Sequence, residues 1–200
     1  MRIIGIGGEP ATGKTSLINK LMSSKKFKKF KYKKILNYLK SGDTIIFGKY
    51  EGSCFDGTDR LSMAVQPVAE QFLIKNKDSS YTIIFEGDRL FNKKFLKFSS
   101  GICETIVVVL SASEKVKHSR HKERKDTQPE TFLKSRKTKI QNIYKSFQIV
   151  TLKNETPEDL STNHKKLIEI MKGKSIKKYI AEGEKYIKEE KSKAGVLKFI

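Results

Sequence analysis

The segment GIGGEPATGKTS, residues 5–16, constrains this chain more than any other. Gly8, four further residues and then Gly13, Lys14 and Thr15 satisfy the pattern GxxxxGK[ST]. An apolar run (residues 2–7) precedes it, and a helical apolar pattern (residues 14–22) follows. A strand, a glycine-rich turn and a helix in this order predict a phosphate-binding loop rather than an inert turn. Residues 8–15 are named the phosphate loop below.

The spacing of the phosphate loop has a physical reason. Gly13 relaxes the backbone so that N–H groups point inward at phosphate oxygens, and the helix that starts there adds the positive end of its dipole. Lys14 reaches the β- and γ-phosphates, and the Thr15 hydroxyl ligates Mg²⁺. We therefore expect ATP and Mg²⁺ as ligands. The other residues expected to contact ATP here are Gly8, Ala11, Thr12 and Ser16.

Apolar runs alternate with helical patterns along the whole chain. The runs at 81–87 and 104–111 are nearly continuous and end in polar residues, which is typical of buried parallel strands. Thr156 before Pro157, and Thr127 before Pro129, are typical of helix starts. The pattern predicts an α/β fold with a five-stranded parallel sheet and helices on both faces. The expected strands are residues 2–7, 44–48, 81–87, 104–111 and 147–152.

No repeat and no long linker divides the 200 residues. We expect one domain over residues 1–172 and a charged helical C-terminal extension over 173–200. A possible apolar stripe on that extension consists of Ile176, Tyr179, Ile180, Tyr186 and Ile187.

The formal net charge is +20, which favours a polyanionic partner such as DNA, although a lysine bias from an AT-rich genome is an alternative. The run KKFKKFKYKK, from Lys25 to Lys34, holds seven lysines and three aromatic residues. Lysines can follow phosphates while the rings stack on bases. The alternative is a basic surface loop whose aromatic side chains anchor it.

Two observations bear on the compartment. The sequence has no run of 18 apolar residues and no secretory pattern after Met1, so we expect a cytoplasmic chain with no membrane partner. Cys54 and Cys103 lie far apart and match no metal spacing, so we expect two reduced bystanders.

Acidic and basic side chains follow two of the expected strands, where ligands bind in open parallel sheets. Asp59 and Asp88 are the candidates for the base that activates an acceptor hydroxyl, with Asp56 and Glu86 behind them. Alternatively, Asp88 or Glu86 holds Mg²⁺ through water. The residues expected to bind the acceptor are Asp56, Arg60, Glu86 and Arg89.

Residues 113–139 form a strongly cationic segment that holds three of the six arginines. Arginine is scarce here, so Arg120 and Arg124 are expected to serve in a mobile lid that neutralises the triphosphate. The alternative is a solvated pair of charged helices. The phosphate loop alone does not separate kinase, GTPase and motor, but the length leaves little room for a motor and no NKxD guanine signature is present. A small phosphotransferase fits best.

These motifs resemble the P-loop nucleotide and nucleic-acid kinases over residues 1–172. The segments GTDRLSMAVQP, FEGDRLF and FLKSRKTKIQNI are most similar to phage 5-hydroxymethyluracil DNA kinases. That resemblance implies transfer of the ATP γ-phosphate to the hydroxymethyl group of a modified pyrimidine in DNA. It also implies that Lys14 and Thr15 hold the nucleotide, that Arg120 and Arg124 act from the lid, and that adenine passes Asn154.

Other acceptors stay open at this point. The DGxGKST start of thymidylate kinases is absent, which weakens a mononucleotide acceptor. The alternatives are a deoxynucleoside monophosphate kinase, a polynucleotide 5′-hydroxyl kinase, and a nucleotide-dependent nucleic-acid-binding module. The sequence does not predict the oligomeric state.

Overall fold

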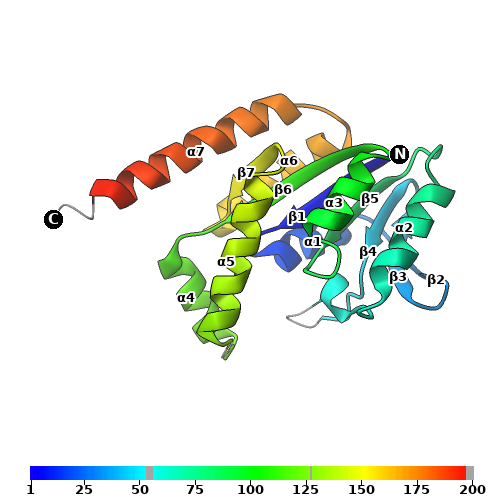
Figure 1. The fold of residues 1–200 in the computed structure, drawn as a ribbon, viewed down its shortest axis with the longest axis horizontal. Helices are drawn as coiled ribbons and strands as arrows, with labels where there is room; N and C mark the ends of the chain where they lie inside the picture. The colour runs from blue at the N-terminus through cyan, green and yellow to red at the C-terminus, as the bar shows by residue number, and fades with distance from the viewer. Residues whose placement is uncertain (53–55, 127, 197–200) are drawn as a thin grey trace.

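The structure is a computed structural model that describes residues 1–52, 56–126 and 128–196. Cys54 and Thr127, for which expectations were stated, lie outside the described residues. One sheet with the strand order β2-β3-β4-β5-β1-β6-β7 forms the centre of the fold (Figure 1). Its strands are β1 (Arg2–Gly7), β2 (Lys28–Tyr32), β3 (Leu36–Ser41), β4 (Thr44–Phe47), β5 (Thr82–Glu86), β6 (Glu104–Ser111) and β7 (Ile149–Lys153).

The five predicted strands are all present and run parallel to one another, from β4 to β7 in the sheet order. The predicted count of five is wrong because the hairpin β2–β3 adds two strands, with β3 antiparallel to β4. Four of the five β2 residues are exposed, so the strand shows none of the apolar pattern by which the others are recognised. The lysine-rich run 25–34 therefore contains an edge strand.

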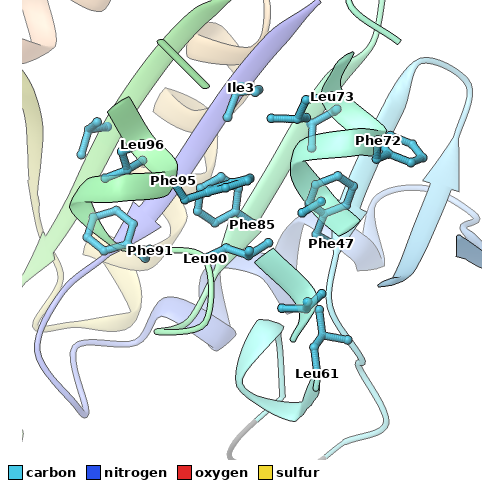
Figure 2. Close-up of a cluster of buried hydrophobic side chains, with 14 of the residues drawn as sticks. Ile3, Phe47, Leu61, Phe72, Leu73, Phe85, Leu90, Phe91, Phe95 and Leu96 are labelled. Atoms are coloured by element: carbon cyan, nitrogen blue, oxygen red, sulfur yellow. The ribbon is translucent and has the colours of Figure 1, made fainter. Parts of the chain in front are cut away.

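Helices cover both faces of the sheet, as predicted. Side chains of α2, α3 and α5 pack on one face with Ile3, Phe47 and Phe85, the cluster shown in Figure 2. Side chains of α1, α6 and α7 pack on the other face with Ile4 and Ile84. The helices are α1 (Lys14–Ser23), α2 (Val65–Lys75), α3 (Lys93–Ser100), α4 (Glu114–Glu123), α5 (Glu130–Tyr144), α6 (Pro157–Met171) and α7 (Ile176–Val196), with the short 3₁₀ helix η1 (Thr58–Arg60).

The start of α6 follows the predicted pattern. Thr156 accepts a hydrogen bond from the Asp159 N–H, the Asp159 side chain bonds back, and Pro157 is the first helical residue. The helix α5 begins at Glu130, so Pro129 precedes the helix instead of opening it. In chain order α4 and α5 stand between β6 and β7, and α6 follows β7.

The C-terminal helix α7 lies along β7 and extends past the sheet at its far end (Figure 1). A Cβ added at Gly183 would lie 2.8 Å from the Thr151 nitrogen, so the helix backbone sits directly on the strand. Tyr179 is buried and donates a 2.6 Å hydrogen bond to Glu169 of α6. Among the described residues, no helix is long and apolar enough to cross a membrane.

Candidate active site

A cavity of about 330 Å³ opens where the parallel strands end. The phosphate loop forms one wall, and residues at and after the ends of β4 and β5 form a second. The third wall consists of Arg124, Asp126 and Gln128 with two side chains of α5. Eleven predicted site residues line it: Gly8, Ala11, Gly13, Lys14, Thr15, Asp56, Asp59, Glu86, Asp88, Arg89 and Arg124. The predicted residues Thr12, Ser16, Arg60, Arg120 and Asn154 are not among its lining residues.

The phosphate loop is held in a conformation that its glycines permit. Gly13 has a φ of 89°, and a Cβ there would lie 2.3 Å from the Asn154 amide nitrogen. Lys14 Nζ donates 3.0 Å hydrogen bonds to the carbonyl oxygens of Gly8 and Glu9, so its side chain lies over the loop. Burial lowers the pKa of Lys14, although nearby carboxylates oppose the shift.

Two residues that were predicted to contact ATP instead donate hydrogen bonds to the backbone of the phosphate loop. Asn154 is buried and donates a 2.8 Å hydrogen bond to the Thr12 carbonyl oxygen. The Arg120 guanidinium donates to the carbonyl oxygens of Ala11, Asn154 and Glu155 at 3.0–3.1 Å. A third contact joins the lid helix α4 to the loop, from Lys117 Nζ to Glu9 Oε2 at 2.7 Å. In this structure α4 is docked against the phosphate loop.

Thr15 and Glu86 provide an oxygen pair suited to Mg²⁺. The Thr15 hydroxyl donates a 3.0 Å hydrogen bond to Glu86 Oε1, and Glu86 is 2% exposed. Burial raises the pKa of Glu86 to about 7, against the opposing effects of Lys14 and of the Thr15 bond. The described residues contain no group of three or more His, Cys, Asp or Glu side chains that could hold a metal. This donor set fits Mg²⁺ held jointly by the protein and nucleotide phosphates.

Asp59 and Asp88, the two candidate bases, lie together but in different surroundings. Asp59 Oδ1 accepts hydrogen bonds from the backbone N–H groups of Asp88 at 2.6 Å and Arg89 at 3.3 Å. Partial desolvation and the Asp88 carboxylate raise the pKa of Asp59. Asp88 forms ion pairs with Arg136 Nε at 3.0 Å and Lys139 Nζ at 2.8 Å, both on α5. Among the described residues, Asp59 therefore forms no ion pair with a cationic side chain, whereas Asp88 pairs with two.

The remaining predicted acceptor ligands divide into two kinds. Asp56 is buried and accepts 2.8 Å hydrogen bonds from the backbone N–H groups of Glu51 and Gly52. Arg60 pairs with Glu51 at 2.7 Å and with Asp56 at 3.1 Å. These contacts organise the loop after β4, and Arg60 does not reach the cavity. Arg89 does line it.

Sequence reasoning missed five cavity residues, most of them from the lid segment. Phe132 and Arg136 lie one helical turn apart on α5, and the Arg136 guanidinium sits 4.4 Å from the Phe132 ring centroid. The scarcity of arginine was a usable signal for Arg136, and Pro10 lies inside the phosphate loop itself. Asp126, Gln128 and Phe132 lie inside the predicted lid, but no pattern singled them out from its other residues. The missed residues are Pro10, Asp126, Gln128, Phe132 and Arg136.

No protein-family model and no curated protein matches this chain. Many solved structures are similar to it, and three of them each cover 85% of the chain. An unliganded sugar kinase from Janibacter sp. HTCC2649 has a TM-score of 0.50 at 12% identity, over 95% of its own length. A shikimate kinase from Bacteroides thetaiotaomicron has 0.47 at 15%, over 98%. A deoxyadenosine kinase from M. mycoides, with the products dCMP and a flexible dCDP bound, has 0.44 at 16%, over 100%.

The likeness to the sugar kinase extends over nearly the whole length of that protein and shows that the two chains share a fold. This agrees with the α/β fold expected from the phosphate loop and the alternating strands and helices.

Proposed function

We propose that this chain is a kinase that transfers the γ-phosphate of ATP to a hydroxyl group. The observation that carries the proposal is a single cavity in which a phosphate loop, the Thr15 hydroxyl bonded to the buried Glu86, and a second carboxylate, Asp59, meet. A plain nucleotide-binding module needs the loop but has no need of the additional acids beside it.

The donor half of the proposed reaction rests on the phosphate loop. Its backbone N–H groups and Lys14 would bind the β- and γ-phosphates, while Thr15 and Glu86 would hold Mg²⁺ directly or through water. When bound, Mg²⁺ neutralises charge on the transferring phosphoryl group. Arg124 lines the same cavity and supplies a further positive charge from the lid.

For the acceptor half, we assign Asp59 as the group that orients and deprotonates the attacking hydroxyl. Its raised pKa suits a carboxylate that must take up a proton, and it opens onto the cavity. In its present contacts Asp88 is held by Arg136 and Lys139, so we assign it to positioning of α5. Arg89 is the assigned ligand for an anionic group on the acceptor.

We further propose that the acceptor hydroxyl belongs to DNA, as the hydroxymethyl group of a modified pyrimidine such as 5-hydroxymethyluracil. The support is the net charge of +20 and the resemblance of three sequence segments to phage 5-hydroxymethyluracil DNA kinases. The rival acceptors are free deoxynucleoside monophosphates and the 5′-hydroxyl end of a polynucleotide.

One experiment separates these acceptors. The protein is incubated with γ-labelled ATP and Mg²⁺, in parallel, with 5-hydroxymethyluracil DNA, ordinary DNA with a free 5′-hydroxyl, and a mixture of deoxynucleoside monophosphates. Label on the modified DNA alone is the expected result. Label only on the monophosphates would overturn the DNA acceptor, and no label on any acceptor would argue against the kinase.

A further inference from the structure

The edge strand β2 lies in the lysine-rich run 25–34, on the same sheet as the strands that line the cavity. All seven lysines of residues 25–34 are exposed. Within residues 1–52, 56–126 and 128–196, none of the seven forms an ion pair with a carboxylate. Lysines on an exposed edge also discourage edge-to-edge association, so their presence alone does not identify a partner.

The strand register places the C-terminal end of β2 at the end of the sheet where the cavity lies. Tyr32 pairs with Leu36, Tyr38 pairs with Phe47, and Phe47 pairs with Phe85. Continued across the sheet, this register places Tyr32 level with Gly87, between Glu86 and Asp88. Three strand spacings of about 4.8 Å separate β2 from β5, so the end of β2 lies about 14 Å from the acceptor carboxylates.

The same strand offers an aromatic surface. Phe30 is 42% exposed and stacks on Tyr38, with the ring centroids 5.5 Å apart and the ring planes 17° apart. The turn after β2 carries Lys33 and Lys34. Side chains alternate between the two faces of a strand, so Lys28 shares a face with Phe30, and Lys29 and Lys31 lie on the other face. Exposed lysines around an exposed ring at one sheet edge are the combination that binds single-stranded nucleic acid with little sequence preference.

We infer that β2 and its turn bind the phosphate backbone of a DNA strand whose modified base occupies the acceptor end of the cavity. This inference rests on the proposed function, since it identifies the surface that holds the same acceptor. At the rise of about 3.4 Å per nucleotide of a stacked strand, the 14 Å gap corresponds to about four nucleotides. The strand itself spans about 13 Å more, so flanks of about eight nucleotides engage the whole surface.

The inference predicts a dependence on acceptor length. With the modified base at the centre of single strands, the KM for the acceptor should fall as the flanks grow from two to four to eight nucleotides, and then stay constant. The kcat should change little, because the flanks lie outside the cavity. Exchange of Lys28, Lys29 and Lys31 for Gln together should remove most of this dependence.

Two variants with three substitutions each provide the controls. Lys28→Arg, Lys29→Arg and Lys31→Arg keep the charge of the surface and should keep the length dependence. Lys177→Gln, Lys185→Gln and Lys188→Gln change the net charge by the same amount on α7, which lies along β7 at the opposite edge of the sheet. This second set should leave the length dependence intact.

Fluorescence anisotropy with the same oligonucleotides, without ATP, tests binding independently of catalysis. Each phosphate contact in a single strand contributes about 0.7 to the slope of log affinity against log salt. The Gln variant on β2 should therefore lower this slope by about 2, and the α7 variant should not. Equal slopes in the two variants would overturn the inference. The lysines would then serve only to prevent edge-to-edge association of the sheet.

The inference and the proposed function fail in different ways. Transfer of label to DNA with a KM that does not vary with length would overturn the β2 surface and leave the kinase. Binding that depends on β2, with no transfer to any hydroxyl, would overturn the kinase and leave a DNA-binding surface.

Discussion

The two halves of the cavity are built on different principles. In the donor half, the phosphate loop is fixed by close packing and by hydrogen bonds to its own backbone, from Asn154 to Thr12 and from Arg120 to Ala11. In the acceptor half, charged side chains hold one another, as Asp88 does with Arg136 and Lys139. The donor half is preorganised, whereas in the acceptor half a charged group of a ligand can replace one partner of an ion pair.

This difference indicates that the donor half of the cavity binds ATP and the acceptor half determines acceptor specificity. A cradle made of backbone groups needs no rearrangement to accept phosphates, so its substitution should affect all acceptors alike. Ion pairs between α5 and the end of β5 can open for one acceptor and stay closed for another. The predictions below test this division.

Lys14→Ala should cause the largest loss. Lys14 is the phosphate-loop cation, and removal of a cation from a transferring phosphoryl group costs about 10³- to 10⁵-fold in kcat. The loss should be the same for every acceptor, measured by label transfer under saturating ATP. Lys177→Ala, an exposed lysine on α7 outside the cavity, serves as the control and should retain its kcat. A loss confined to one acceptor would place Lys14 in the acceptor half.

Asp59→Asn should lower kcat by about 10²- to 10⁴-fold, the usual contribution of a general base, with little change in the KM for ATP. Asp88→Asn breaks the pairs with Arg136 and Lys139 and should instead raise the KM for the acceptor. Steady-state kinetics of both variants with the preferred acceptor check this. The reverse pattern would assign Asp88 as the base, and wild-type kinetics in both would refute either assignment.

Glu86→Gln should change how stability varies with pH. The pKa of Glu86 is about 7 in the folded protein, above the ordinary 4.5, so the folded state holds the proton more tightly than the unfolded state. The stabilising effect of that proton is fully present below pH 4.5 and is lost as the pH rises through 7. Relative to Glu86→Gln, the wild type should therefore lose about 3 kcal/mol between pH 4.5 and pH 8.

Urea unfolding of both proteins at several pH values, without nucleotide, measures this difference. Only the change with pH counts, because the exchange also alters the surroundings of Lys14 at every pH. A difference in unfolding free energy that stays constant with pH would show that the pKa of Glu86 is the same in the folded and unfolded protein, and so that burial does not raise it.

Gly13→Ala tests the packing of the donor half. A left-handed residue with a Cβ costs about 1–2 kcal/mol, and this Cβ would also meet the Asn154 amide at 2.3 Å. Gly42 has a φ of 55° with no atom within 4 Å of an added Cβ, so Gly42→Ala carries only the conformational cost. We expect a raised KM for ATP in Gly13→Ala alone, measured beside the thermal unfolding of both. Equal kinetics in the two variants would contradict the contact with Asn154.

The phosphate loop was recognised from the sequence because its signal is local. Gly13, Lys14 and Thr15 stand next to one another, and the strand before them and the helix after them are read from neighbouring residues. The parallel strands were found for the same reason, since buried strands consist of continuous apolar runs. Strand β2 was missed because its residues are mostly exposed, so no apolar pattern exists to find.

The acceptor half depends on contacts between distant segments, which residue spacing does not encode. Asp88 and Arg136 are 48 residues apart and meet only because α5 folds back across the end of β5. Arg120 was predicted to reach phosphate because arginine is scarce, yet it donates to the carbonyl oxygens of Ala11 in the loop and of Asn154 and Glu155 beside it. The scarcity of arginine indicated that Arg120 is needed for the hydrogen-bonding geometry of its guanidinium, and the fold shows which acceptors it contacts.

Arg60→Ala should have the smallest effect on stability and kinetics, and it tests whether Arg60 belongs to the acceptor half of the cavity. Arg60 was predicted to grip the acceptor, but it pairs with Glu51 and Asp56, and Asp56 keeps two backbone N–H donors without it. The Tm should fall by no more than about 2 °C, as for other partly exposed pairs, and kcat/KM should stay within about twofold. Arg89→Ala removes an arginine that lines the cavity and should raise the KM for the acceptor about tenfold. If Arg60→Ala raised that KM as much as Arg89→Ala while the Tm stayed unchanged, Arg60 would turn toward the acceptor on binding, and the acceptor half would be more mobile than its ion pairs indicate.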